Sequence, residues 1–113
     1  MKNNYVSSFD KSKACEAHNG TILAADVLPV GVKAPFGHAW GYLEGKSMME
    51  AHSHPTEEIY LVTGGKGHCH INGERFAVKP GDVIEIPPGA EHTMECADGS
   101  TLLWAAFWWD PID

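Results

Sequence analysis

Two short segments of the chain concentrate side chains that can bind a metal ion. The first segment carries His52, His54 and Glu58, and the second carries His92 just after a Pro-Pro-Gly turn. Two histidines at positions i and i+2 of an extended chain point to the same side, so both imidazoles can reach one point. Pro55 then turns the chain, which lets Glu58 return a carboxylate to that point. Imidazoles with a carboxylate suit a divalent transition metal (Mn, Fe, Co, Ni, Cu or Zn) better than Mg or Ca.

Glu57 is a second carboxylate next to Glu58, and strand alternation separates the two. If residues 58–63 form a strand, Glu58 shares one face with Tyr60, whereas Glu57 falls on the other face with Ile59. We therefore expect Glu58, and not Glu57, to face the histidines. The alternative to a metal site is a fold that keeps these residues without binding an ion.

The elements that must position these residues are short strands. Glycine, proline and asparagine turns recur along the chain, with Asn72-Gly73 the clearest hairpin turn, and β-branched and aromatic runs lie between them. Such a series predicts an all-β sandwich or barrel. Residues 1–20 are more polar and are expected to form an N-terminal arm, a short helix or an edge element, with one barrel domain over residues 21–113. The expected strands cover residues 22–28, 36–43, 47–52, 58–63, 67–71, 75–78, 83–86, 93–96 and 102–109.

Composition excludes several classes of partner. The chain has 113 residues and a net charge of −7, and Arg75 is its only arginine. A nucleic acid or an anionic membrane surface would require a basic stripe, which the sequence lacks. The longest apolar stretch, residues 102–109, is too short to span a bilayer. Residues 1–5 show no secretory signal, and three cysteines without CxxC spacing favour the reducing cytoplasm.

The two metal-binding segments resemble the two conserved motifs of the cupin family. Residues 45–65 resemble the first motif, a glycine followed by His-x-His, three or four residues, Glu, six residues and Gly. Gly45 lies one residue farther from the histidines than is usual. Residues 81–96 resemble the second motif, G-x5-P-x-G-x2-H-x3-N, with Cys96 at the position of the final Asn. The matching positions are His52, His54, Glu58 and Gly65 in the first motif, and Gly81, Pro87, Gly89 and His92 in the second.

The resemblance implies a small single-domain cupin, a double-stranded β-helix (jelly-roll barrel) of the RmlC-like, conserved-barrel type. It also implies that His52, His54, Glu58 and His92 bind one divalent transition metal near an open end of the barrel. Four protein ligands leave one or two coordination positions for a ligand, which is typical of a catalytic site. We therefore favour a metal-dependent enzyme (a dioxygenase, lyase or isomerase) acting on a small oxygenated metabolite. The alternative is a non-catalytic cupin that binds or senses a small ligand.

Other residues are weaker candidates for roles near the metal. Glu50 and Tyr60 share strand faces with expected ligands and are the acid–base candidates. Substrate-pocket candidates are Met94 and Cys96, which share the face of His92, and Trp40 and Trp104, which lie in aromatic runs. Because bidentate recognition of dicarboxylates or phosphates usually requires arginine, the ligand is expected to be neutral or fairly apolar. We expect His18, His68, His70 and Arg75 to be exposed to solvent.

Residues 36–42 alternate aromatic or histidine side chains with glycine or alanine. On a strand this pattern builds one wide aromatic face and one nearly bare face. The aromatic face could pack against another sheet, line a substrate pocket or form a subunit interface. Together with the aromatic run of residues 104–109, it favours a homodimer that buries some of these rings.

Overall fold

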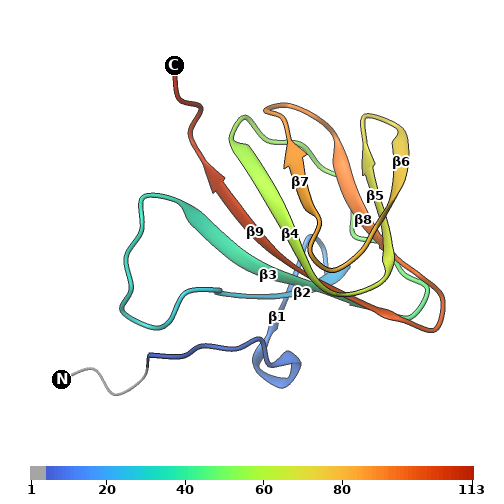
Figure 1. Cartoon of the computed structure of the whole chain (residues 1–113), viewed down its shortest axis with the longest axis horizontal. Coiled ribbons are helices and arrows are strands. Elements are labelled where there is room, and N and C mark those ends of the chain that lie inside the picture. Colours follow the sequence, from blue (N-terminus) through green and yellow to red (C-terminus); the bar gives the residue numbers. More distant parts are fainter. Residues whose placement is uncertain (1–4) are drawn as a thin grey trace.

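The computed structural model describes residues 5–113, so the first four residues of the expected arm, and most of the segment examined for a secretory signal, lie outside the described residues. The described part folds into two antiparallel sheets (Figure 1). A six-stranded sheet has the order β1-β2-β3-β9-β4-β7, and a three-stranded sheet has the order β6-β5-β8. The strands are β1 (Cys15–Ala17), β2 (Ile22–Ala25), β3 (Gly37–Glu44), β4 (Glu57–Gly65), β5 (Gly67–Ile71), β6 (Glu74–Val78), β7 (Val83–Ile86), β8 (His92–Cys96) and β9 (Thr101–Trp109). The predicted all-β jelly-roll architecture is therefore confirmed.

The hairpin between β5 and β6 shows how local sequence determines the topology. Asn72 and Gly73 have φ values of 49° and 85°, and the flanking residues Ile71 and Glu74 are paired. Both turn positions of a type I′ hairpin require positive φ, which asparagine and glycine adopt at low cost. The turn therefore sets the register in which β5 delivers its side chains to the sheet.

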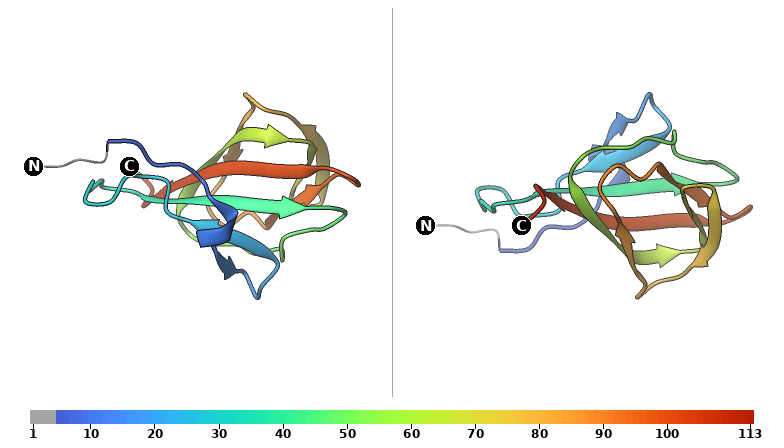
Figure 2. Two further views of the ribbon diagram at one scale, coloured as in Figure 1. Left: turned by 90° about the horizontal axis from the view of Figure 1, so that it is seen from below. Right: turned by 90° about the horizontal axis from the view of Figure 1, so that it is seen from above.

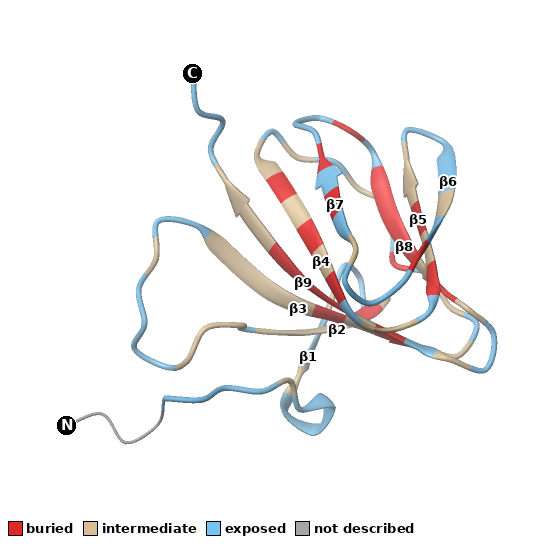
Figure 3. Cartoon of the chain, viewed as in Figure 1, coloured by how far each residue is buried: buried red, intermediate tan, exposed pale blue. Residues whose placement is uncertain are grey.

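The core lies between the two sheets, where the inward faces of β4, β8 and β9 meet (Figure 3). Along β4, Glu58, Tyr60 and Val62 are buried while the residues between them are more exposed. This alternation matches the expected period of two. Trp104 on β9 and Met94 on β8 are almost completely buried in the same cluster. The long β2–β3 loop and the C-terminus extend from one end of the barrel (Figure 2).

The expected strand over residues 47–52 is wrong, because this segment forms only isolated bridges. Met48 pairs with Glu95 and His52 pairs with His92, without a continuous ladder between them. Two backbone groups between these bridges form hydrogen bonds with side chains instead. The Thr93 hydroxyl donates to the carbonyl of Met49, and the N–H of Glu50 donates to Thr21 Oγ1 at 2.8 Å. Such side-chain bonds compete with strand pairing. His52 therefore lies on a loop that runs alongside β8.

The bare face of β3 turns out to be the inward face. Gly37 lies opposite Trp108 and Gly41 opposite Trp104 on β9, and a Cβ at either glycine would overlap the facing indole. The other face of β3 is partly covered by the chain itself, since the Phe9 ring lies 6.3 Å from Trp40 and 5.1 Å from Tyr42 between centroids. The arm that carries Phe9 therefore covers part of the aromatic face, for which a subunit interface is one of the three expected roles.

Three further features concern the described residues. The part of the chain that the structure describes contains no helix long and apolar enough to cross a membrane. Its only helical turn is the 3-10 segment η1 (Lys11–Lys13), which precedes β1. Cys15, Cys69 and Cys96 are all free thiols.

Candidate metal centre

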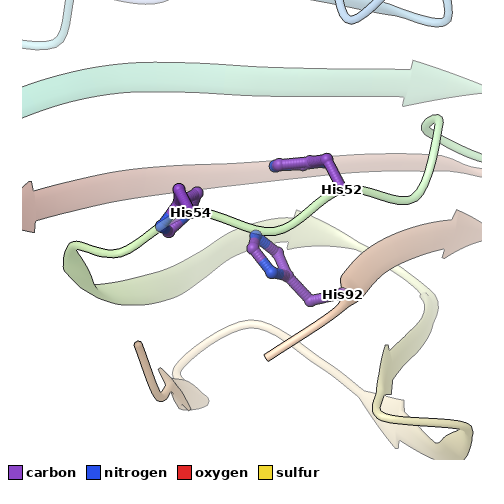
Figure 4. A group of neighbouring side chains, drawn as sticks. All are labelled: His52, His54 and His92. Carbon is purple, nitrogen blue, oxygen red and sulfur yellow. The ribbon is translucent and has the colours of Figure 1, made fainter. Parts of the chain in front are cut away.

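Three histidines converge at one end of the barrel (Figure 4). His52 and His54 lie on the loop between β3 and β4, and His92 lies at the start of β8. One ring nitrogen of each histidine lies within 4.8 Å of the corresponding nitrogens of the other two. This spacing suits simultaneous binding of one ion, because a zinc–imidazole bond, for example, is about 2.0–2.1 Å long.

Backbone carbonyls orient two of these rings. His52 Nδ1 lies 3.0 Å from the carbonyl oxygen of Glu50, and His92 Nδ1 lies 2.9 Å from that of Ala90. A carbonyl can only accept a hydrogen bond, so each Nδ1 carries the proton and each Nε2 keeps its lone pair. This is the arrangement found when a histidine binds metal through Nε2.

The Nε2 atom of His92 tests whether the site fits a metal. The side chain is completely buried, and Nε2 has no hydrogen-bond partner among the described residues. A buried lone pair without a partner is costly, because it loses its hydrogen bond to water. A metal ion at the point shared with His52 and His54 would satisfy it. The donor set and the orphaned nitrogen therefore both fit a divalent transition metal.

Glu58 adds a carboxylate from the start of β4. Its Oε1 lies 2.8 Å from His54 Nε2 and 3.3 Å from His92 Nε2, and the residue is only 7% exposed. Glu57 points to the other face of the strand, where its carboxylate accepts a 3.0 Å hydrogen bond from Trp109 Nε1. The structure therefore places Glu58 with the histidines and Glu57 away from them.

Burial keeps two neighbouring groups in their neutral forms. Burial lowers the pKa of His52, which favours the neutral imidazole that a metal requires. Burial also raises the pKa of Tyr60 well above its usual value, with a smaller contribution from the charge of Glu58. The Tyr60 hydroxyl is therefore a hydrogen-bond donor at neutral pH rather than a base.

A cavity of about 460 Å³ adjoins the candidate metal ligands. His52, His54 and Glu58 form part of its wall, and the rest is mostly apolar. No lysine or arginine is found among the described residues that line it. The volume is within the range of about 300–1,000 Å³ typical of small-molecule sites. The apolar and aromatic part of the wall includes Ile22, Met49, Tyr60, Trp104, Ala106 and Trp108.

The other sequence candidates divide into two groups. Tyr60, Trp104 and Trp40 border the cavity. Trp40 lies between Ala39 and Gly41, which face inward, so its indole is directed toward Phe9 on the other face of β3.

Met94 and Cys96 share the inward face of β8 with His92 but are buried in the core, outside the cavity lining. Glu50 also lies outside the lining and is exposed, and both its carboxylate oxygens accept hydrogen bonds from the Asn19 side chain.

His18 is a residue of the site that the sequence did not reveal. It is exposed, as predicted, yet its ring stacks on His52 with centroids 4.0 Å apart and an angle of 24° between the ring planes, and it lines the cavity. Partial desolvation of the stacked ring lowers the pKa of His18. No motif links two histidines 34 positions apart, and only the path of the β1–β2 hairpin brings them together.

His68 and His70 are half-buried rather than fully exposed, and they form a polar cluster with Glu95 and Arg75 on the outer side of the three-stranded sheet. His70 Nε2 lies 2.9 Å from Glu95 Oε1, and Arg75 donates to the same oxygen at 3.0 Å. Arg75 itself is exposed, as predicted. These residues are separate from the metal centre.

Comparisons with known proteins agree with this geometry. A family model described as Cupin domain matches residues 40–109. An uncharacterised protein of Methanocaldococcus jannaschii, MJ1618, is 33% identical over 92 residues, which cover 79% of this chain and 73% of that protein. A cupin 2 conserved barrel domain protein of Salinispora arenicola has a TM-score of 0.82 at 24% identity, covering 96% of this chain and 91% of its own. The plu4264 protein of Photorhabdus luminescens has a TM-score of 0.81 at 29% identity, covering 95% and 88%.

Proposed function

This chain belongs to the cupin family, and we propose that it is a metal-dependent enzyme whose ion is held by His52, His54, Glu58 and His92. The observation that carries the proposal is the buried, unpartnered Nε2 of His92 beside two further imidazoles and a carboxylate. A cavity of about 460 Å³ at the same point gives a small molecule access to the ion. An ion with an open coordination position, beside a cavity, is typical of a catalytic rather than a structural site.

The residues have distinct tasks in this proposal. The bound ion would supply Lewis-acid or redox chemistry to an oxygen atom of the ligand. Glu58 provides a negative charge that offsets the charge of the ion. Tyr60, protonated at neutral pH, can donate a hydrogen bond into the cavity. Trp104 and Trp108 exclude water from one wall and offer flat surfaces to a planar group.

The cavity supports a neutral or weakly charged, largely apolar substrate with oxygen atoms that can reach the ion. Its lining within the described residues has no cationic side chain, so a dicarboxylate or phosphate would lack a counter-charge apart from the metal. Hydroxy acids, keto acids, enediols and catechol-like groups match these requirements. A dioxygenase, a lyase and an isomerase are the reaction classes that such a site could serve.

Metal analysis of purified protein tests the proposal. Inductively coupled plasma mass spectrometry should find about one transition-metal ion per chain in the wild type and a small fraction of that in His92→Ala. His68→Ala, a histidine outside the site, should keep the wild-type content. Wild-type protein that takes up none of Mn, Fe, Co, Ni, Cu or Zn after dialysis against each would refute the proposal.

Oxygen-electrode measurements with the loaded protein then divide the reaction classes. Oxygen consumption that requires both iron and a catechol or keto-acid substrate identifies a dioxygenase. Turnover without oxygen consumption identifies a lyase or isomerase. Saturable ligand binding without turnover of any of these compounds identifies a binding or sensor module instead.

We also propose a homodimer and a cytoplasmic location. Phe36, just before β3 with 37% of its surface exposed, and Val30, on the β2–β3 loop with 90% exposed, leave apolar surface that a second copy could cover. The odd number of cysteines, all free, supports a reducing compartment. Light scattering that gives a mass near 12.3 kDa in solution would contradict the dimer, and recovery in a secreted fraction would contradict the location.

A further inference from the structure

The ligand His52 is held by a loop rather than by a strand. Its residue forms one isolated bridge with His92, whereas His92 belongs to β8 and Glu58 to β4. The backbone of His52 exchanges two hydrogen bonds with that of His92, at 3.1 and 2.9 Å, which fix the backbone but not the imidazole ring. The orientation of the His52 ring must therefore be set by contacts of the ring itself.

The β1–β2 hairpin makes such contacts at Glu50, two residues before His52. Asn19 Nδ2 lies 2.9 and 2.7 Å from the two carboxylate oxygens of Glu50, and the N–H of Glu50 donates to Thr21 Oγ1 at 2.8 Å. The carbonyl of the same Glu50 lies 3.0 Å from His52 Nδ1. Glu50 is thus anchored to the hairpin by its side chain and N–H while its carbonyl orients the imidazole of His52.

The hairpin also contacts His52 directly. The His18 ring stacks on the His52 ring with centroids 4.0 Å apart, and neither His18 nitrogen has a hydrogen-bond partner within residues 5–113. The ring is therefore held by the turn and by stacking alone. The turn adopts an unusual backbone, with φ of 49° at His18, 59° at Asn19 and 75° at Gly20. Left-handed backbone is uncommon for residues other than glycine, but histidine and asparagine adopt it more readily than most, which suits them to this turn.

We propose that residues 18–21 act as a clamp that positions His52 for metal binding, with His18 as the positioning residue. This inference rests on the proposed metal site. Outer groups that orient metal ligands typically contribute about 10- to 100-fold to metal affinity. The clamp assigns a function to the N-terminal segment and to Glu50, which lies outside the cavity.

The affinity for Co²⁺ tests whether the clamp contributes to metal binding, and the measurement needs no substrate. The dissociation constant for Co²⁺ and the visible absorption of bound Co²⁺ are compared in wild type, His18→Ala, His18→Phe and Asn19→Ala. His18→Ala should weaken binding by about 10- to 100-fold, and Asn19→Ala should weaken it in the same direction. His18→Phe keeps a flat ring over His52, so it should stay within about threefold of wild type and keep its spectrum, since stacking needs only the ring face.

His68→Ala controls for loss of a histidine outside the site, and circular dichroism of each metal-free variant confirms that it is folded. A wild-type dissociation constant in both His18→Ala and Asn19→Ala overturns the clamp and leaves the metal site intact. Equal weakening in His18→Phe and His18→Ala also overturns it, because His18 would then act through its nitrogens. A wild-type protein that binds no Co²⁺, Zn²⁺ or Fe²⁺ overturns both the clamp and the proposed function.

Discussion

Substitution of Gly41 by alanine should destabilise the protein, because the added methyl group would overlap the indole of Trp104. A Cβ at Gly41 would lie 2.4 Å from both Cε2 and Cζ2 of Trp104 and 2.8 Å from its Nε1. Optimal carbon–carbon contacts are about 3.5–4.0 Å, so the indole would have to move by about 1 Å. Trp104 is 1% exposed, with Tyr60 5.7 Å away between ring centroids, so the ring cannot turn out to solvent.

The magnitude follows from two opposing effects. Forcing an additional carbon into a packed core costs about 1–3 kcal/mol. Replacing glycine by alanine returns about 0.4–1 kcal/mol, because the unfolded chain loses conformational freedom. We expect the free energy of unfolding to fall by about 1–2 kcal/mol, which corresponds to a decrease in Tm of about 4–8 °C for a domain of this size.

Urea denaturation followed by tryptophan fluorescence measures this change. Gly64→Ala is the matched control: Gly64 is also on a strand, but its Cβ would meet the nearest atom, Leu103 Cβ, at an ordinary 3.7 Å. The control should stay within about 0.5 kcal/mol of wild type.

A double-mutant cycle tests the proposed contact itself. Trp104→Phe removes the second ring of the indole, so Gly41→Ala should cost less in that background than in wild type. The reasoning is refuted if Gly41→Ala is as stable as Gly64→Ala, or if its cost is unchanged in the Trp104→Phe background.

Five further perturbations follow from individual residues and from the proposed metal site. Glu58→Gln should weaken Co²⁺ binding at least tenfold, since the charged ligand is lost, whereas Glu57→Gln, which alters only the Trp109 hydrogen bond, should not; calorimetric titration measures both. Addition of Co²⁺ at 100 times its dissociation constant should stabilise the protein by about 2.7 kcal/mol in urea denaturation, and His92→Ala should show no such gain. Thr93→Val removes the buried hydroxyl that donates to the Met49 carbonyl and should cost about 1–3 kcal/mol, whereas Thr63→Val at an exposed site should cost little. Burial raises the pKa of Cys69 to about 12 from 9.0, so a thiol reagent at pH 8 should modify only exposed Cys15 rapidly, with all three thiols reacting in urea. Because the unfolded thiol ionises first, the contribution of Cys69 to stability should be present below pH 9 and be lost as the pH rises from about 9 to 12.

Features that depend on neighbouring residues could be predicted from the sequence. The Asn72-Gly73 turn requires only its own two residues to adopt positive φ. The distinction between Glu58 and Glu57 follows from alternation along one strand, and the two carboxylates do lie on opposite faces of β4. In both cases the controlling period or conformation is encoded within a few residues.

The inward face of residues 36–42 could not be predicted from their own sequence. The alternation is real, but the sequence of β3 does not indicate which face is inside. That depends on β9, whose Trp104 and Trp108 fill the space opposite Gly41 and Gly37. A glycine face next to an aromatic strand is therefore as compatible with a packed interior as a face of large side chains.

The strand predicted for the segment before the first metal-binding motif is wrong for a related reason, and this has a consequence for function. Residues 47–52 are predicted from the sequence to form a strand, yet the hydroxyls of Thr21 and Thr93 form hydrogen bonds with backbone groups that a ladder would need. The backbone of His52 stays paired with His92, but its ring contacts His18, and Asn19 holds the neighbouring Glu50, so residues distant in sequence help to orient the ring. A ligand that leaves the regular sheet can be adjusted relative to His92 and Glu58, which remain on strands. In the proposed metal site, changes in the N-terminal segment, the least patterned part of the sequence, are therefore expected to alter metal affinity without altering His52, His54, Glu58 or His92.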